Sequence, residues 1–178
     1  GEGTADEITE QLDALLEGKE LAAETLEKWQ ESQPDPITLE GVEPIWTVEG
    51  AYSDVAVHRG KAEIYALKMG RSIDVLDLKG EIKRKVKTPV DANILRTVNL
   101  LGDEEPEFLL FTSWRRSVTA IDGQGEQLWD YPRGQGIDDV WGLDINQDGK
   151  DEVIIGYNGN TGLHVLDNQG QPLWKYTR

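Results

Sequence analysis

Apolar and polar residues alternate in short runs over most of this chain, from about residue 44 to the C-terminus. Near the C-terminus these runs cover residues 138–145, 152–157, 162–167 and 171–177, and turn residues such as Asp148-Gly149 and Asn168-Gln169-Gly170 separate them. Short alternating runs bounded by Gly, Asn and Asp are typical of β-strands joined by tight turns. The pattern therefore predicts four antiparallel strands in this stretch.

The first 32 residues follow a helical spacing instead. Thr4 and Glu7 form a capping-box pattern, and one apolar stripe follows, made of Ile8, Leu12, Leu15, Leu16, Ala22, Leu26 and Trp29. Pro34 and Pro36 then end the helix, because proline lacks a backbone donor and restricts the residue before it. We expect an acidic amphipathic helical segment at 1–32 and a linker at 33–43. The helix either packs on its own domain or binds a partner.

A repeat of 45 residues becomes visible when Asp77, Asp122 and Asp167 are aligned. The register extends upstream to Asp54, Asn99 and Asp144, and downstream Leu128-Trp129-Asp130-Tyr131 matches Leu173-Trp174-Lys175-Tyr176. The first copy departs from this last-strand pattern, because it has Lys83-Arg84-Lys85-Val86 there. Upstream, Ile45-Trp46-Thr47 resembles the last strand of a preceding copy that is otherwise missing. A fixed period of this length indicates propeller blades, solenoid turns or a trefoil.

The repeat predicts an all-β fold of about three tandem four-stranded propeller-type blades at residues 44–178, because four short strands in some 45 residues make one blade. Three blades are fewer than the usual ring of about four to eight. The chain is then a fragment, or blades of several chains complete the ring. The alternative is a β-trefoil, which closes with three repeats. Recurring aromatics such as Trp129 and Trp174 are expected to pack between blades.

Residues 144–156 read Asp-Ile-Asn-Gln-Asp-Gly-Lys-Asp-Glu-Val-Ile-Ile-Gly. This segment resembles the FG-GAP/VCBS family of propeller repeats, and the copy ends at 125–129 and 170–174 are similar to PQQ-type propeller repeats. The resemblance covers residues 44–178 and leaves out the N-terminal segment. It implies β-propeller blades, Ca²⁺ loops and a secreted or cell-surface setting.

The same segment has the oxygen spacing of a loop that wraps a hard cation. Asp144, Asn146 and Asp148 place side-chain oxygens at positions 1, 3 and 5, Gly149 follows at position 6, and the Lys150 carbonyl can fill position 7. The family pattern implies that Glu152 closes the shell. We expect one Ca²⁺ per chain, because the second copy has Leu101 at position 3 and the first has no comparable set. The alternative is a plain hairpin with an Asp148-Gly149 turn.

Trp114 is the second candidate. It lies between the second and third strands of its copy, beside Arg115 and Arg116, on the face opposite the expected cation loop. An aromatic residue flanked by two arginines in a loop suits recognition of a ligand. The alternative is a tryptophan folded back over a blade edge. His58 and His164 are isolated and expected to be structural, and no catalytic set is visible.

The charge and the amino-acid composition of the chain disfavour several classes of function. The net charge is −16, and residues 1–49 hold 14 acids against two lysines, which disfavours nucleic-acid binding and anionic membranes. No apolar run approaches the length of a membrane span, and the absence of Cys excludes disulfides and thiolate sites.

We therefore expect a non-catalytic Ca²⁺-binding module for protein or carbohydrate binding or assembly, with self-association as a possible consequence of open flanks. An extracellular, cell-surface or periplasmic bacterial location suits weak Ca²⁺ loops. The alternatives are a fragment of a propeller enzyme, either polysaccharide-degrading or quinone-dependent, and a purely structural oligomerisation domain.

Overall fold

The computed structural model describes residues 44–58, 60–69, 71–114, 117–132 and 136–177, and residues 45–178 form one compact unit. The expected helical segment at 1–32, the linker at 33–43, and Arg115 and Arg116 lie outside the described residues. Within the described ranges, no helix is long and apolar enough to cross a membrane.

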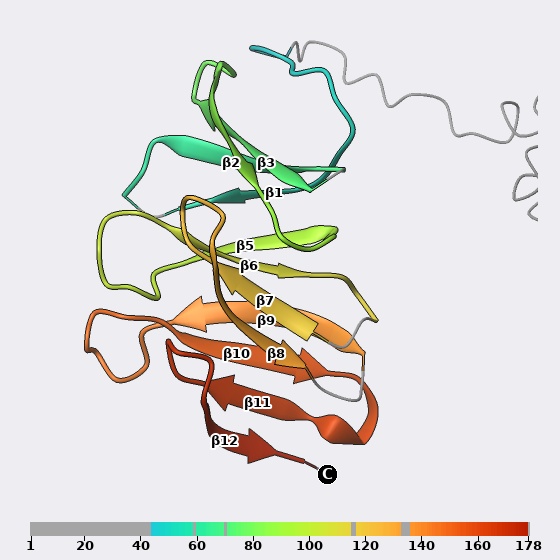
Figure 1. Ribbon diagram of the computed structural model, residues 1–178, viewed down its shortest axis with the longest axis vertical. Helices are drawn as coiled ribbons and strands as arrows, with labels where there is room; N and C mark the ends of the chain where they lie inside the picture. The colour runs from blue at the N-terminus through green and yellow to red at the C-terminus, as the bar shows by residue number, and fades with distance from the viewer. Residues whose placement is uncertain (1–43, 59, 70, 115–116, 133–135, 178) are drawn as a thin grey trace, which may run out of the picture. The chain divides into compact units, whose positions relative to one another are not determined.

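Twelve strands in the described residues make three antiparallel four-stranded sheets (Figure 1). The first sheet contains β1 (Tyr52–Val57), β2 (Glu63–Lys68), β3 (Ser72–Asp77) and β4 (Ile82–Lys87). The second contains β5 (Ile94–Val98), β6 (Glu107–Phe111), β7 (Ser117–Ile121) and β8 (Gln127–Pro132). The third contains β9 (Ile137–Leu143), β10 (Glu152–Tyr157), β11 (Leu163–Leu166) and β12 (Pro172–Tyr176), with a short 3₁₀ turn, η1 (Gly159–Thr161), before β11.

The three sheets confirm the predicted all-β fold of tandem propeller-type blades. Each sheet is a meander in which strands adjacent in sequence are adjacent in space. The first strands of successive sheets are neighbours, since β1 contacts β5 and β5 contacts β9 (Figure 1). The sheets stay separate and do not share one barrel, so the trefoil alternative is wrong.

The turn between the third and fourth strands is the most regular part of the repeat. In each copy the Oδ1 atom of Asp77, Asp122 or Asp167 accepts hydrogen bonds from the backbone amides two and four residues later. The glycine three residues after each aspartate, Gly80, Gly125 or Gly170, has a φ of 81°, 97° or 78°. The local sequence explains why these turns recur, because the aspartate side chain organises the turn and glycine has no Cβ penalty at positive φ.

The 45-residue register does not extend to the first strand of the first copy. Val57 faces Ile64, seven positions later, whereas Arg96 faces Leu109 and Trp141 faces Ile154, each thirteen positions later. The loop between β1 and β2 is therefore shorter than the two that follow. Asp54 lies inside β1, so it is not equivalent to Asn99 and Asp144, which come after their strands.

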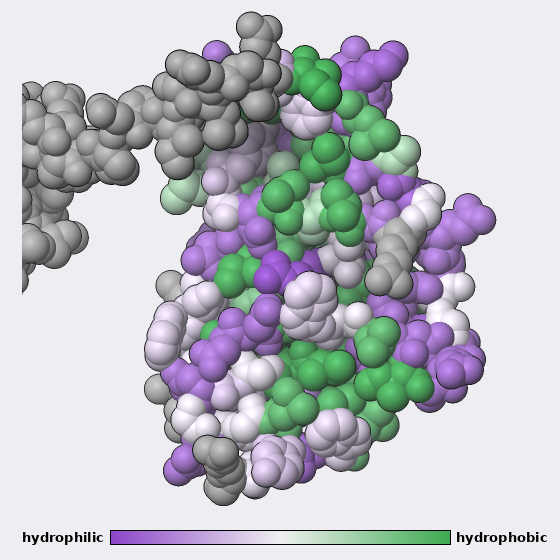
Figure 2. All heavy atoms as spheres, turned by 180° about the vertical axis from the view of Figure 1, so that it is seen from behind, coloured by the Kyte–Doolittle hydropathy of each residue, from purple (hydrophilic) through white to green (hydrophobic). Residues whose placement is uncertain are grey.

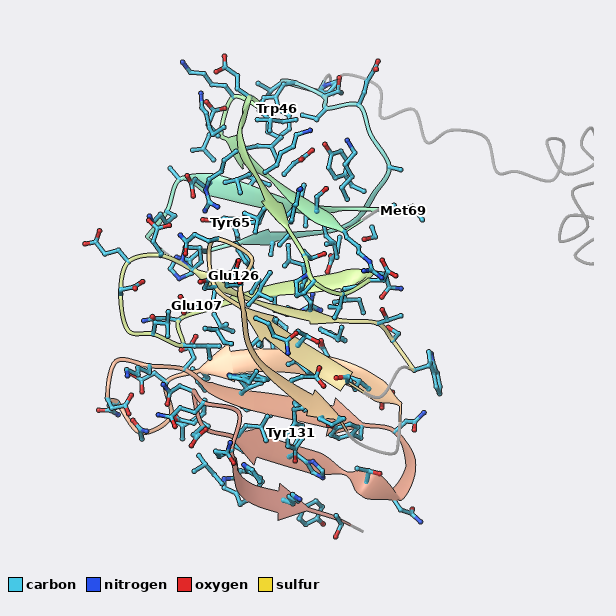
Figure 3. The ribbon with its side chains drawn as sticks, viewed as in Figure 1. Trp46, Tyr65, Met69, Glu107, Glu126 and Tyr131 are labelled. Carbon is cyan, nitrogen blue, oxygen red and sulfur yellow. The ribbon has the colours of Figure 1, made fainter. Side chains whose placement is uncertain are left out.

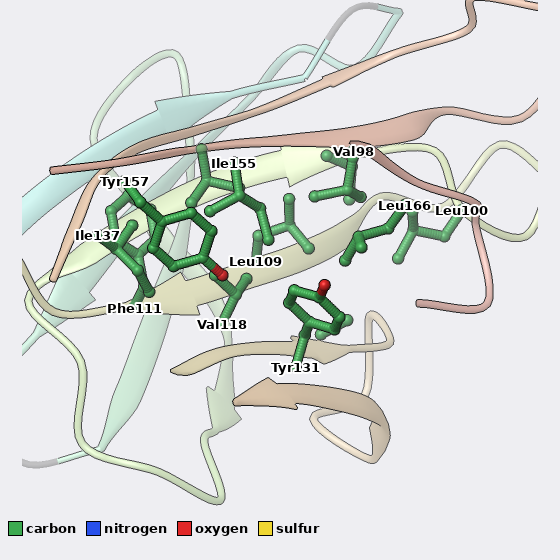
Figure 4. Close-up of a cluster of buried hydrophobic side chains, with 13 residues drawn as sticks. Val98, Leu100, Leu109, Phe111, Val118, Tyr131, Ile137, Ile155, Tyr157 and Leu166 are labelled. Atoms are coloured by element: carbon green, nitrogen blue, oxygen red, sulfur yellow. The ribbon is translucent and has the colours of Figure 1, made fainter. Parts of the chain in front are cut away.

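The core lies between the sheets in two layers. Between the first and second sheets, buried residues include Tyr65 and Phe108, whose ring centroids are 5.2 Å apart. Between the second and third sheets, the layer includes Leu109, Tyr131 and Ile155 (Figure 4). The first sheet thus buries apolar side chains against the second, and the second against the third, which is how a blade without its own closed core gains stability.

Candidate functional site

The predicted cation-binding loop lies between β9 and β10 and is held together by its own side chains. Asp144 accepts hydrogen bonds from the amides of Asp148 and Gly149, at 3.1 and 3.0 Å, and Asp148 accepts from the amide of Lys150 at 2.9 Å. The Asn146 side-chain oxygen also accepts from the Asp148 amide, at 2.8 Å. Four of the five predicted residues, Asp144, Asn146, Asp148 and Lys150, therefore lie in one tight loop.

Glu152 has a structural role that the loop spacing did not indicate. Its side chain is buried at the start of β10, and its Oε2 atom accepts from the amides of Ile145 and Asn146, at 2.9 and 3.4 Å. Glu107, one period earlier, likewise accepts from the amides of Leu100 and Leu101, at 2.5 and 3.1 Å. A glutamate at this position therefore closes the loop between the first two strands in a copy that lacks the full oxygen set.

The chemistry of the donor set fits a hard cation. The Asn146 side-chain nitrogen donates to Asp148 Oδ2 at 3.2 Å and to Glu152 Oε1 at 2.8 Å, so a neutral amide group bridges two carboxylates. Among the described residues, however, no three Asp, Glu or His side chains converge on one point as metal ligands do. Ca²⁺ binding here would require the Asn146 amide to turn its oxygen inward.

Trp114 lies in the loop between β6 and β7, and the residue is 74% exposed. This loop and the β9–β10 loop are at opposite ends of the strands. Figure 3 shows the same separation for Met69, the counterpart of Trp114 in the first sheet, and Glu107 at the start of β6. The Trp114 amide donates to the carbonyl oxygen of Ile137 at 3.2 Å, which ties the loop to the third sheet.

The backbone of Trp114 is in the left-handed region, with a φ of 68°. Gly159, one period later, has a φ of 67°. The second and third copies thus have the same left-handed backbone at this position. The third copy has glycine there, which adopts that conformation without strain. A non-glycine residue in this region costs roughly 1–2 kcal/mol. The fold therefore tolerates a strained tryptophan at an exposed loop position.

A cavity of about 410 Å³ lies beside this loop. Thr112 and Ser117 line it from the two ends of the Trp114 loop, and Arg71, Asp91 and Asp130 contribute charged groups. Arg71 donates to both carboxylate oxygens of Asp91, at 2.6 and 2.9 Å. Asp130 accepts hydrogen bonds from the hydroxyl groups of Ser117 and Thr119. This end of the strands therefore combines an exposed aromatic side chain with a recess that both polar and apolar side chains line.

Arg96 on β5 connects all three sheets, and sequence reasoning missed it. Its Nη1 atom donates to Asp54 Oδ2 and its Nη2 atom to Asp139 Oδ1, both at 3.1 Å. The guanidinium lies 5.7 Å from the Trp141 ring centroid, and Trp141 Nε1 donates to Asp139 Oδ2 at 2.9 Å. Asp54 and Asp139 are not one repeat apart, so the period offered no signal for this network.

His164 is buried, and its Nδ1 atom lies 3.1 Å from the Tyr131 hydroxyl oxygen, as expected for a structural histidine. Its contact joins the second and third sheets.

Comparison with known proteins supports the fold. Residues 108–178 match the family model of the lambda-carrageenase beta-propeller domain, which is less than half of the chain. The chain resembles the crystal structure of BamB from Moraxella catarrhalis, with a TM-score of 0.50 and 16% identity, over 74% of this chain and 38% of BamB. It also matches the Dos1 propeller, with a TM-score of 0.47 and 18% identity, over 74% of this chain and 40% of that one.

The chain thus spans less than half the length of these two structures. No curated protein shows significant similarity to the sequence. At these identities the likeness concerns the β-propeller fold alone.

Proposed function

We propose that this chain is a non-catalytic binding module of β-propeller type, which recognises a protein or carbohydrate ligand with the Trp114 end of its strands. The observation that carries the proposal is the left-handed backbone of Trp114, a residue that is 74% exposed. Backbone strain of this kind persists where the surrounding structure enforces it, and it clusters at functional sites. A large exposed aromatic side chain beside a recess of mixed polar and apolar lining suits the face of a sugar ring or an apolar side chain of a protein.

The experiment compares the chain with Trp114→Gly in binding to polysaccharides, measured by isothermal titration calorimetry. Sulfated galactans come first, because the matched family is named for a carrageenase, and neutral polysaccharides follow. Met69→Gly is the control, since it removes an exposed apolar side chain from the equivalent loop of the first sheet. Binding that Trp114→Gly abolishes and Met69→Gly preserves supports carbohydrate recognition. Binding unaffected by either variant contradicts a role for Trp114.

Calcium stabilisation of the β9–β10 loop is the second part of the proposal. Asp144, Asn146, Asp148 and Glu152 with the Lys150 carbonyl would hold the ion, which would offset the repulsion between three carboxylates. A ligand that binds only the folded state stabilises it by about 2.7 kcal/mol at a concentration 100 times its Kd. We expect millimolar Ca²⁺ to raise the melting temperature.

Asp148→Ala should abolish the calcium-induced rise in melting temperature, and Asp103→Ala should not. Asp103 is the control because it lies one period earlier, in a loop with Leu101 in place of an oxygen donor. Calorimetry that detects neither heat nor a melting shift at millimolar Ca²⁺ contradicts the calcium site. Loops of modest affinity suit millimolar external calcium, so we propose an extracellular, surface or periplasmic bacterial setting.

A fragment of a polysaccharide-degrading propeller enzyme is the second candidate function, favoured by the family match at residues 108–178. Release of reducing ends from lambda-carrageenan by the purified chain would establish this activity. Binding without release supports the non-catalytic module.

A further inference from the structure

The recess beside the Trp114 loop, of about 410 Å³, lies between walls from the first and second sheets. Arg71 and residues 89–91 form the wall on the first-sheet side, and β6, β7 and β8 supply the other wall. Arg71 and Asp91 neutralise each other through their two hydrogen bonds. The remaining formal charge on the walls is therefore that of Asp130 on β8. Hydrophilic side chains also run along this end of the strands, at the left edge of Figure 2.

Asp130 is held in one orientation by two hydroxyl groups of β7. Ser117 and Thr119 both donate to its Oδ1 atom, Thr119 at 2.8 Å. Thr119 is 3% exposed and faces Asp130 across β7 and β8, so the sheet itself fixes this donor. Among the described residues, no group donates to Asp130 Oδ2, and no lysine or arginine pairs with this carboxylate. One oxygen of an oriented carboxylate is thus left to accept a donor from a ligand.

The repeat shows that the fold does not require a carboxylate at this position. The residue equivalent to Asp130 is Lys85 in the first copy and Lys175 in the third. In the first sheet, Lys85 faces the buried Asp74, and its Nζ atom lies 3.8 Å from Asp74 Oδ1. The first sheet therefore supplies its own lysine to its carboxylate. The second sheet has a carboxylate where its neighbours have an ammonium group, and a ligand can supply the missing cation.

The other lining residues suit a side chain with an apolar stem. Val90, Leu110 and Phe111 add apolar surface to the recess beside the charged end of Asp130. A lysine side chain has this composition, because a stem of methylene groups carries a compact ammonium group. Arginine fits less well, since its planar fork pairs best with both oxygens of a carboxylate. Here Oδ1 is already occupied by the two hydroxyl groups.

We propose that this recess binds a lysine side chain of a protein partner, whose ammonium group donates to Asp130 Oδ2. The inference rests on the proposed function of this end of the strands as a binding surface, and it names the chemistry of the ligand. The net charge of −16 favours the approach of a basic partner. An amino sugar also carries an ammonium group, but its ring presents hydroxyl groups in place of an apolar stem.

The test is an NMR titration of the isotope-labelled full chain with a single lysine whose α-amino and carboxyl groups are capped. We expect the amide signals of Ser117, Thr119 and Asp130 to shift with its concentration, and added NaCl to weaken the response because a charge pair is screened by salt. The same compound acetylated at Nζ keeps the stem but loses the charge, so it should leave these signals in place. Equal responses to the two compounds, or no response to either, overturn the proposal.

Asp130→Asn should weaken the affinity for the capped lysine about fivefold, which corresponds to about 1 kcal/mol for an exposed charge pair. Asparagine keeps an acceptor for Ser117 and Thr119, so the local structure is preserved. Asp138→Asn is the matched control, because it removes an exposed carboxylate from β9, outside the recess, and should retain the original affinity. Equal affinities of the original chain and Asp130→Asn overturn the proposal. If a variant does not fold, the two lysine compounds still decide the question on the original chain.

Capped arginine and glucosamine identify the source of the cation in the same titration. A response to glucosamine as large as that to capped lysine would assign the recess to an amino sugar, and a larger response to arginine would exclude the lysine assignment, so either result overturns the proposal.

Trp114→Gly separates this inference from the proposed function. Trp114 does not line the recess, so the variant should keep its response to capped lysine. Lysine binding at Asp130 without any Trp114-dependent ligand contradicts the role of Trp114 alone. Trp114-dependent binding without a response to capped lysine overturns only the lysine recess.

Discussion

Trp114 and Gly159 occupy equivalent positions in successive repeats and have the same left-handed backbone, with φ values of 68° and 67°. The tryptophan adopts this conformation because its amide is bound to Ile137 on the neighbouring sheet. At the scale of the residue, the proposed binding surface therefore depends on a local strain that glycine would relieve.

Trp114→Gly should stabilise the chain by about 0.5–1 kcal/mol, as the strain relieved exceeds the entropy that glycine adds to the unfolded state. Trp114→Ala is the control, because it removes the indole but keeps the Cβ that causes the strain. Urea unfolding measures both. Stabilisation by alanine equal to that by glycine would show that the exposed indole, and not the backbone, is responsible.

The buried Glu107 makes stability depend on pH. Burial raises the pKa of its carboxyl group, against the opposing effect of the hydrogen bonds from the Leu101 and Leu100 amides. Because the pKa is raised in the folded state, the contribution of protonated Glu107 to the free energy of unfolding is complete in acid. That contribution is lost as pH rises through the folded-state pKa. Ionised Glu107 therefore lowers the stability of the folded chain at neutral pH.

Glu107→Gln keeps a hydrogen-bond acceptor but removes the charge. Its stability relative to the original chain should increase as pH rises above the usual range of a glutamate pKa, as measured by thermal unfolding at a series of pH values. Glu126→Gln, at an exposed position, provides the baseline. Parallel pH profiles for the original chain and Glu107→Gln would contradict this explanation.

At the scale of the element, the Asp-x-x-Gly turns combine two requirements. The glycine adopts a positive φ within its own hairpin, and it also lies against the preceding sheet. For Gly125, a Cβ would lie 2.2 Å from the carbonyl oxygen of Lys87, at the end of β4. The turn is thus a point of contact between blades as well as a link between strands.

Gly125→Ala should destabilise the chain by clearly more than Gly60→Ala. Both positions have a positive φ, 97° and 89°, so both substitutions introduce roughly 1–2 kcal/mol of backbone strain. Only Gly125 adds a collision, because a Cβ at Gly60 would meet nothing within 4 Å. Chemical denaturation gives the two free energies of unfolding, and equal losses would mean that the close approach to Lys87 is unimportant.

At the scale of the whole described unit, Arg96 joins the three sheets through Asp54 and Asp139. These ion pairs are only partly exposed, and Asp54 also accepts a hydrogen bond from the Leu95 amide. Partly buried, hydrogen-bonded charges are costly when one partner is removed. The first strands of the three blades therefore share one guanidinium group, and β1 and β5 are also joined by the hydrogen bond from the Thr97 hydroxyl group to the Val57 carbonyl oxygen.

Arg96→Met should lower the free energy of unfolding by about 1–3 kcal/mol, since it leaves two carboxylates without their common partner. Lys83→Met is the comparison, because Lys83 pairs with Asp77 at 2.8 Å within a single sheet and at the surface. An exposed pair of that kind contributes about 0–1 kcal/mol. Similar losses in the two variants would exclude a special role for Arg96 in joining the blades.

The sequence by itself determined the features that depend on neighbours along the chain. The 45-residue period, the four strands per copy and the Asp-x-x-Gly turns follow from alternation and from bonds that span two to four residues. Such patterns recur in the sequence because the same local interactions recur in each copy. The gathering of Asp144, Asn146 and Asp148 in one loop, next to Glu152 at the start of β10, was predictable for the same reason, while the calcium ion itself stays a prediction.

Only the tertiary structure decided the contacts between blades. The placement of Arg96 between Asp54 and Asp139 depends on segments some 40 residues apart in the sequence, and the exposure of Trp174 depends on what packs against the third sheet. These contacts follow from how the sheets stack, and stacking leaves no period in the sequence. Trp129 and Trp174 look alike along the chain, yet one is partly buried and the other exposed, because only one is followed by another blade among the described residues.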